Sequence, residues 1–552
     1  MDYNTEKKLN IYQPLIYAFI MIMGMFLGFK VYQTTYGNSV SGLPISLNKN
    51  ASLSQINDVL QFVEQHYVDT INSSKLVDDA ISEILENLDP HSSYIPPKDM
   101  KQVAESLQGN FEGIGIEFFI INDTITVVTP ISGGPSEAIG IHAGDKIVEI
   151  EDTMVAGIGL SNKDVINKLR GEKGSVVKVG ISRIGVDKVL DFKIKRDKIP
   201  LYSVDVGYMM DEDVGYIKIN RFSQTTYREF TEKLIELKEK GMKDMVLDLR
   251  QNPGGYLTAA TNIIDEFLGD RRLIVYTEGR THKRNDYKAR RKGMFEQGDL
   301  VVLIDQGSAS ASEILAGAVQ DWDRGTILGR RSFGKGLVQE QYQLRNGGAL
   351  RLTVARYYTP TGRSIQKHYE MGKAADYENE LAARYDSGEF TNQDSIKYDE
   401  GEIFQTSAGR TVYGGGGISP DIFMPIDTSV NEEFSIQALS LVPKFSYDYF
   451  GKHQLELDDY KSFDEFNAAF NINANIFNSF KNYLKAEDLS LKDDQLVKHS
   501  AIFKTRIKAH IARQIWNNDG FYPVLHQLDE EVIEAYRLIK EEQLITDRLS
   551  LN

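Results

Sequence analysis

Three short segments contain residues whose types and spacing could support acyl transfer. The first is Gly307-Ser308-Ala309-Ser310-Ala311-Ser312-Glu313, which lies between an apolar run and a helical pattern. A turn of small residues from a strand into a helix exposes a hydroxyl group and directs the positive end of the helix dipole towards a developing oxyanion. Taken alone, however, the segment fits a helix N-cap better, with Ser310 or Ser312 bonded to backbone donors.

The second segment supplies a candidate base for such a serine. His282 and His368 lie in charged, polar stretches outside any recognisable motif, whereas Lys335 lies in Ser332-Phe333-Gly334-Lys335-Gly336-Leu337-Val338-Gln339. A lysine can act as a base if burial lowers the pKa of its amine, and the flanking glycines allow the backbone to pack closely around it. Gln339 could orient the amine by a hydrogen bond. Taken alone, Gly-Lys-Gly is more typical of a surface turn.

The third segment is Asp248-Leu249-Arg250-Gln251-Asn252-Pro253-Gly254-Gly255, which follows an apolar run. Its two glycines suit a loop that presents backbone N–H donors, although an ordinary Pro-Gly turn fits equally well. The chain contains no His-Glu-x-x-His zinc pattern.

The surrounding pattern predicts an α/β arrangement that would position these segments. Runs at 214–219, 245–249 and 300–304 are typical of buried strands, and 226–240 and 312–321 of helices. Before them, residues 109–198 predict a β-rich module with one helix at Asn162–Leu169. Residues 372–400 are charged and poor in apolar residues, which predicts a surface excursion.

The N-terminus and the composition indicate where such a protein acts. An apolar run from Leu15 to Phe29 follows Lys7 and Lys8, which predicts an uncleaved signal anchor with a cytoplasmic stub; a cleaved signal peptide is the alternative. Both place the bulk of the chain on the periplasmic side of the cytoplasmic membrane. The net charge of −16 argues against nucleic-acid binding, and the absence of cysteine excludes disulfides and a thiol nucleophile.

These motifs occur together and in an order that resembles the carboxyl-terminal processing peptidases, a family of tail-specific serine–lysine proteases. The resemblance covers about residues 53–425 and shows no departure at a motif position. Besides the three segments, it rests on these motifs: Leu88-Asp89-Pro90-His91-Ser92-Ser93-Tyr94, Phe111-Glu112-Gly113-Ile114-Gly115-Ile116, Thr359-Pro360-Thr361-Gly362-Arg363-Ser364-Ile365-Gln366 and Tyr413-Gly414-Gly415-Gly416-Gly417-Ile418-Ser419-Pro420-Asp421.

The resemblance implies roles for individual residues. Ser310 would be the nucleophile, Lys335 the base and Gln339 its orienting partner. No metal or cofactor would be needed. The backbone N–H groups of Ala311 and of Gly255, rather than Gly254, would bind the oxyanion. The β-rich module would be a PDZ domain that captures a protein C-terminus by strand addition. Its binding loop and strand would comprise Gly113, Ile114, Gly115, Ile116 and Phe118.

The expected fold is therefore multidomain α+β, with a membrane anchor, a PDZ domain, a peptidase core and a helical extension. We expect the helical extension to pack against the core rather than to recruit an adaptor, and a homo-oligomer is a further alternative. The expected boundaries are 1–36 for the stub and anchor, 37–52 for a linker, 53–108 for a helical region, 109–198 for the PDZ domain, 199–427 for the peptidase core and 428–552 for the helical extension.

Two other functions are compatible with parts of this pattern. A non-catalytic PDZ scaffold would have no need to keep Ser310, Lys335 and Gln339 together. A hydrolase of small esters could share the fold, since fold does not determine substrate. However, a small ester has no C-terminal strand for a PDZ domain to bind, so the sequence favours protein tails as substrates.

Overall fold

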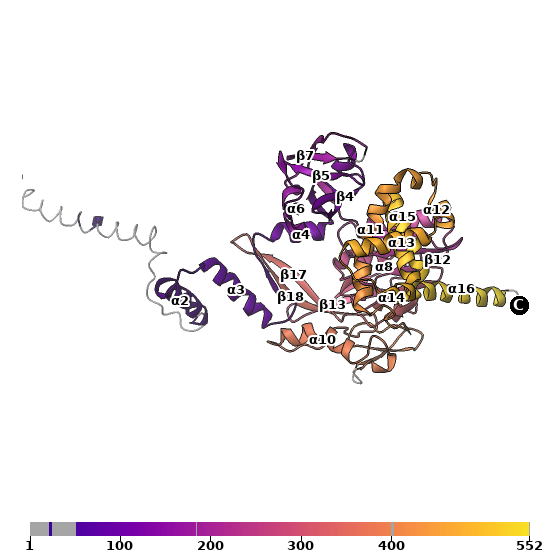
Figure 1. The fold of residues 1–552 in the computed structure, drawn as a ribbon. Helices are drawn as coiled ribbons and strands as arrows, with labels where there is room; N and C mark the ends of the chain where they lie inside the picture. Colours follow the sequence, from indigo (N-terminus) through magenta and orange to yellow (C-terminus); the bar gives the residue numbers. More distant parts are fainter. Residues whose placement is uncertain (1–20, 22, 25–50, 184, 399–401, 551–552) are drawn as a thin grey trace, which may run out of the picture. The chain divides into compact units, whose positions relative to one another are not determined.

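The computed structural model describes residues 51–183, 185–398 and 402–550, together with residues 21, 23 and 24 (Figure 1). Apart from those three residues, the expected stub and anchor lie outside the described residues, as does the linker up to residue 50. Within the described part of the chain, no helix is both long and apolar enough to cross a membrane. The chain divides into two compact units, residues 1–79 and 80–552.

The expected N-terminal helices are present. The first unit contains α2 (Ala51–His66) and the beginning of α3 (Ser73–Glu86), which are joined by a hydrogen bond of 2.9 Å from the Ser73 hydroxyl to Glu64. The second unit begins with the end of α3 and continues through β1 (Ser93–Ile95) and α4 (Met100–Gln108).

A β-rich module follows, as expected, and its helix α6 has the predicted bounds. Its main sheet is antiparallel with the strand order β3-β4-β5-β7-β8, and β6 pairs with β5. The helix begins at a capping box in which Ser161 accepts from the N–H of Asp164. The elements are β2 (Asn110–Gly113), β3 (Ile116–Ile121), β4 (Thr124–Pro130), α5 (Pro135–Ala138), β5 (Lys146–Ile150), β6 (Thr153–Met154), α6 (Asn162–Leu169), β7 (Val176–Ser182), β8 (Leu190–Lys195) and β9 (Asp197–Pro200).

The centre of the second unit is a six-stranded sheet of order β10-β11-β12-β15-β16-β21. It is parallel from β11 onwards, and β10 is antiparallel to β11. The predicted strands and helices of the α/β region are thereby confirmed. The elements are β10 (Val204–Met209), β11 (Val214–Ile219), α7 (Thr226–Glu239), β12 (Asp244–Asp248), α8 (Leu257–Ile264), β15 (Leu300–Ile304), α9 (Ala311–Asp321), β16 (Thr326–Gly329) and β21 (Ile422–Phe423).

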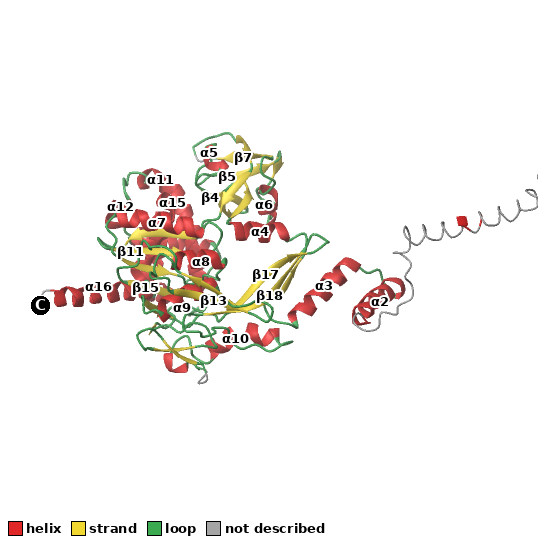
Figure 2. Cartoon of the chain, turned by 180° about the vertical axis from the view of Figure 1, so that it is seen from behind, coloured by secondary structure: helices red, strands yellow, loops and turns green. Residues whose placement is uncertain are grey.

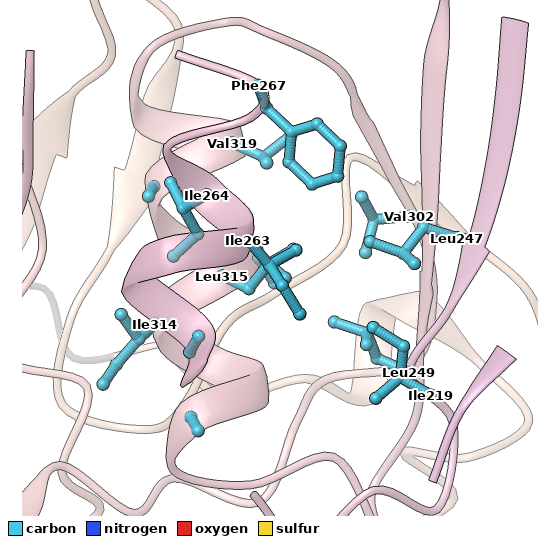
Figure 3. Close-up of a cluster of buried hydrophobic side chains, with 14 of the residues drawn as sticks. Ile219, Leu247, Leu249, Ile263, Ile264, Phe267, Val302, Ile314, Leu315 and Val319 are labelled. Carbon is cyan, nitrogen blue, oxygen red and sulfur yellow. The ribbon is translucent and has the colours of Figure 1, made fainter. Parts of the chain in front are cut away.

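One face of this sheet forms the main apolar core with α7, α8 and α9. Figure 3 shows strand-side residues such as Leu247 and Val302 facing Ile263 of α8 and Leu315 of α9. Because β12 and β15 are parallel neighbours, the loops that leave their carboxyl ends begin side by side. These loops contain the Pro-Gly-Gly turn and Ser310.

A second sheet supports the lysine segment (Figure 2). Its long strand β18 pairs with β1, β13 and β17 over different parts of its length, and β14 pairs with β13. This pairing brings the segment around Asp89 next to β18, the partner of the strand that follows Lys335. The strands are β13 (Leu273–Glu278), β14 (Asn285–Lys288), β17 (Leu337–Gln343) and β18 (Ala349–Tyr358).

The expectation of a surface excursion at 372–400 was wrong for part of that segment. Tyr377, Arg384 and Glu389 are buried, and Arg384 donates to the carbonyl oxygens of Arg331 and Ser332. The charged composition was misleading because the buried charges are paired with one another. The elements here are α10 (Ala374–Asp386) and η1 (Gln393–Ser395), followed by β19 (Ile403–Gln405) and β20 (Thr411–Tyr413).

The C-terminal region is helical, as expected, and most of it has an apolar core of its own. Its last helix instead covers the second face of the central sheet, where Val532, Ala535 and Ile539 pack with Val246 and Val301. These contacts favour packing over adaptor recruitment. The elements are α11 (Glu433–Leu457), α12 (Phe463–Ala469), α13 (Ala474–Ala486), α14 (Asp493–Lys498), α15 (Ser500–Leu525), η2 (His526–Leu528) and α16 (Glu530–Ser550).

Candidate active site

Ser310 occupies a sharp turn between the loop after β15 and helix α9. Its φ of 56° is positive, which is strained for a residue with a side chain and is often found at functional sites. The residue therefore occupies the N-cap position that the sequence suggested, but in the conformation of a nucleophile elbow rather than the extended one of an ordinary cap.

A buried carboxylate joins the serine segment to the lysine segment. Glu313, on the first turn of α9, accepts from the N–H of Ser310 at 2.7 Å and from the N–H of Lys335 at 2.9 Å. Its other oxygen accepts from the N–H of Gly334 and the hydroxyl of Ser332. Burial raises the pKa of Glu313, but the four donors oppose that shift and fit the ionised form.

The Lys335 side chain lies mostly out of solvent at the start of the hairpin β17–β18. Burial lowers the pKa of its amine, and the positive charge of Arg351 lowers it further, while Glu313 and Asp89 act in the opposite direction. Gly336 permits this packing, because a Cβ there would lie 2.8 Å from the backbone nitrogen of Gln366. The Tyr357 hydroxyl bonds to the carbonyl oxygens of both Ser310 and Lys335, which links the two segments again.

The Pro-Gly-Gly turn lies directly against Ser310. A Cβ on Gly254 would be 2.8 Å from both the Cβ of Ser310 and the nitrogen of Ala311, so only glycine fits. The N–H of Gly254 already donates to Asn252. Among the described residues, the N–H groups of Gly255 and Ala311 have no hydrogen-bond acceptor, so these two donors remain available to an oxyanion.

Arg250, at the start of this turn, is tied to the C-terminal helix. Its guanidinium forms a bidentate pair with Asp529 at 2.9 and 3.0 Å and bonds to Glu531 and Asp248. Glu531 also pairs with Arg330 after β16. Paired, hydrogen-bonded carboxylates at the beginning of α16 therefore anchor the loop that carries the candidate oxyanion donors.

Gln339 is near the lysine segment, but its hydrogen-bond partner is Thr353. The distance from its Nε2 to the Thr353 hydroxyl is 3.3 Å. Within the described part of the chain, no hydrogen bond joins the Ser310 hydroxyl, the Lys335 amine and the Gln339 amide to one another. Catalytic hydrogen bonds are often long or unformed without substrate.

Several supporting residues were not identified from the sequence. Asp89 accepts from Thr353, and its negative charge also acts on Lys335. The Ser-x-x-Glu spacing of Ser310 and Glu313 is a capping-box signal that could have revealed the buried carboxylate. Tyr357 and Thr353 lie on β18, whose pairing with β17 the sequence did not reveal.

The histidines do not provide a better base. His282 is partly exposed and His368 is exposed, and each approaches a glutamate. His91 is near enough for the charge of Lys335 to affect it, and burial lowers its pKa to about 4. Its ring nitrogen lies 2.8 Å from the Tyr377 hydroxyl, so this nitrogen is already hydrogen-bonded to a residue other than Ser310. Among the described residues, no group of three or more His, Asp or Glu side chains could hold a metal ion.

The β-rich module has a groove of about 360 Å³ between β3 and α6. Four of the five predicted residues line it: Ile114, Gly115, Ile116 and Phe118. Gly113 does not, because it pairs with Asp197 of β9. The groove is lined further by Phe111, Glu117, Asn162, Ile166, Leu169 and Arg170, to which the sequence analysis assigned no binding role.

The groove has the features that a peptide C-terminus requires. Strand β3 is at the edge of its sheet and can pair with an added strand. The carbonyl oxygens of Ile114 and Gly115 accept from Ser136 and Ile131, whereas the N–H groups of these two residues have no acceptor among the described residues. Those N–H groups could bind a terminal carboxylate, and the apolar wall could take apolar side chains.

Comparison with known proteins gives matches to the same regions. The model for peptidase family S41 matches residues 213–378, that for the PDZ domain matches residues 113–195, and residues 434–517 match a family of unknown function. A carboxy-terminal-processing protease of Bartonella bacilliformis is 40% identical over 326 residues, which cover 58% of this chain and 74% of that protein.

Two further similarities extend the comparison. The carboxy-terminal processing protease CtpA of Bacillus subtilis is 33% identical over 334 residues, which cover 60% of this chain and 71% of that protein. Among solved structures, the photosystem II D1 C-terminal processing protease is 27% identical, and the alignment covers 68% of this chain and 93% of that one with a TM-score of 0.35.

Proposed function

Since the chain belongs to the carboxy-terminal processing proteases of peptidase family S41, and so is a serine-type peptidase with a PDZ domain, we propose that Ser310 is its nucleophile and Lys335 its general base. One observation carries this proposal. The single buried carboxylate of Glu313 accepts from the backbone N–H of both residues, so it holds the two segments together. The lowered pKa of Lys335 favours the neutral amine that a base must have.

The proposed reaction is acyl transfer. Neutral Lys335 takes the proton of the Ser310 hydroxyl while the Ser310 oxygen attacks the scissile carbonyl carbon. The negative oxygen of the tetrahedral intermediate accepts from the N–H groups of Gly255 and Ala311. The Lys335 ammonium then gives its proton to the leaving amine, and the acyl-enzyme forms. Water, deprotonated by Lys335, releases the acyl group and restores the Ser310 hydroxyl.

The proposed substrates are proteins with free C-terminal tails. The free edge of β3 would add the tail as a strand, and the N–H groups of Ile114 and Gly115 would bind its carboxylate. The apolar lining by Ile116 and Phe118 favours apolar terminal side chains. The enzyme would therefore cut proteins whose tails the PDZ domain holds.

The parent and two variants test this function in two assays. Residues 37–552, Ser310→Ala and Lys335→Ala are compared on an unstructured protein with an apolar C-terminus, with thermal melting as the control for folding. We expect activity in the parent and none in either variant; activity that survives Ser310→Ala would refute the assignment. A peptide and its C-terminal amide test the tail: equal cleavage of the two would rule out recognition of the carboxylate.

We further propose that the catalytic part is exported and tethered to the cytoplasmic membrane. This rests only on the apolar run from Leu15 to Phe29 after Lys7 and Lys8. Cell fractionation and protease accessibility test it, and recovery of the full-length chain in the cytosolic fraction would refute it.

A further inference from the structure

A chain of hydrogen bonds that begins at Asp89, before β1, sets the orientation of the Gln339 amide. Gln339 of β17 is the direct register partner of Thr353 of β18, and its Nε2 lies 3.3 Å from the Thr353 hydroxyl oxygen. An amide has a donor end and an acceptor end, so the direction of the Thr353 hydroxyl decides which end faces it.

Asp89 determines where the proton of the Thr353 hydroxyl points. The Thr353 Oγ1 lies 3.0 Å from Oδ1 of Asp89, a buried carboxylate, and an ionised carboxylate can only accept. Asp89 is itself fixed, because it accepts from the N–H groups of His91 and Ser92 and from the Ser92 hydroxyl at 2.6 Å. The Ser92 hydroxyl in turn accepts from the N–H of Thr353, which closes the ring of bonds.

The single proton of the Thr353 hydroxyl is therefore used on Asp89, and the hydroxyl oxygen can only accept from Gln339. The NH₂ end of the amide must face Thr353, so its oxygen faces away from this network. Lys335 lies just before β17, the strand that contains Gln339, and the charges of Asp89 and Arg351 both act on its amine.

We propose that Asp89 and Thr353 are positioning residues, which turn the oxygen of the Gln339 amide towards the Lys335 amine. An N–H of the neutral amine donates to that oxygen, and its lone pair is left to take the proton of Ser310. This assigns a role to the Leu88-Asp89-Pro90-His91-Ser92 segment, which lies far from the catalytic residues in sequence. The inference rests on the proposed function.

The experiment is a double-mutant cycle on Thr353 and Gln339, read as kcat and KM for β-casein cleavage by residues 37–552. Thr353→Val removes the hydroxyl with little change in volume, and we expect about a tenfold lower kcat, the size of one lost hydrogen bond, with KM unchanged. Thr353→Ser keeps the hydroxyl and should restore most of the rate. Thr277→Val, on the neighbouring strand β13, is the matched control and should leave kcat unchanged.

The double variant separates positioning from general stability. If Thr353 acts through Gln339, Thr353→Val should cause no further loss of kcat in the Gln339→Ala background. Additive losses, or a Thr353→Val variant as fast as the parent, would overturn the inference. An inactive parent, or activity that survives Lys335→Ala, would instead overturn the proposed function, so the two failures are distinguishable.

Discussion

Replacing Glu313 by glutamine tests whether one carboxylate holds the nucleophile and the base in register. The amide oxygen can keep only one of the two acceptor positions. The better choice retains the N–H groups of Ser310 and Lys335, and it places the NH₂ group opposite the N–H of Gly334 and the hydroxyl of Ser332. Two buried donors then lose their acceptor.

The magnitude follows from these two donors. A hydrogen bond to a charged group contributes about 1.5–3 kcal/mol, so Glu313→Gln should lower the free energy of unfolding by about 4 kcal/mol. If only a third of that loss appears as misplacement of Ser310 and Lys335 in the transition state, kcat falls about tenfold. Loss of the negative charge also lowers the pKa of Lys335, which moves the acidic limb of the pH–rate profile to lower pH.

The assay measures denaturant unfolding, kcat and the pH–rate profile for parent and variant. Asp265→Asn is the matched control, because Asp265 is another buried carboxylate that accepts from backbone N–H groups, at Arg290 and Arg291. It lies at the end of α8 that is opposite to the Pro-Gly-Gly turn. We expect the control to lose stability and keep its kcat. A Glu313→Gln variant that is less stable but has the kcat and pH profile of the parent would refute the reasoning.

Three further predictions concern pH and packing. Because the positive charge of Arg351 lowers the pKa of Lys335, and the base must be neutral, Arg351→Gln should move the acidic limb of kcat/KM to higher pH. Burial lowers the pKa of His526 from 6.5 to about 4, so the unfolded state binds more protons. Stability should fall by up to about 3 kcal/mol as pH drops through that window, and His526→Gln should flatten this dependence in urea titrations. In α16, Ile539→Ala should cost about 3 kcal/mol and Ile533→Ala little, since Ile539 is buried and Ile533 is 47% exposed.

Each of these predictions has a contrary outcome. An acidic limb that stays in place in Arg351→Gln would mean that another group titrates there. A His526→Gln variant with the acid sensitivity of the parent would assign that sensitivity to other groups, such as His510 and His91, whose pKa values burial also lowers to about 4. Equal losses at Ile533 and Ile539 would contradict the packing of α16 on the sheet.

The sequence predicted the elements of the α/β core well because their apolar runs are long and fully buried. The predicted strands 214–219 and 300–304 agree with β11 and β15, and in the β-rich module the predicted helix 162–169 agrees with α6. Periodicity carries such information locally. The same patterns indicated nothing about which strands pair, so the proximity of Asp89 to Thr353 could not be foreseen.

The candidate site was predictable in its parts but not in its connections. Ser310, Lys335 and the Pro-Gly-Gly turn were each ambiguous alone and were recognised through the order of their motifs and the family resemblance, and the structure brings their segments together. The burial of Glu313 and Arg384 could not be predicted, because a charged residue is expected to be solvent-exposed unless its partners are known. The prediction that Gly113 lines the groove was wrong, because Gly113 pairs with Asp197 of β9 and the lining includes the next residue, Ile114, instead.

The position of α16 has a consequence for biosynthesis. A chain leaves the ribosome from its N-terminus, so the strands β12 and β15 emerge long before the helix that covers their second face. Until then, Val246 and Val301 lack their apolar cover, and Arg250 lacks Asp529 and Glu531. We therefore expect the anchored loop beside Ser310 to assemble only after α16 has been synthesised.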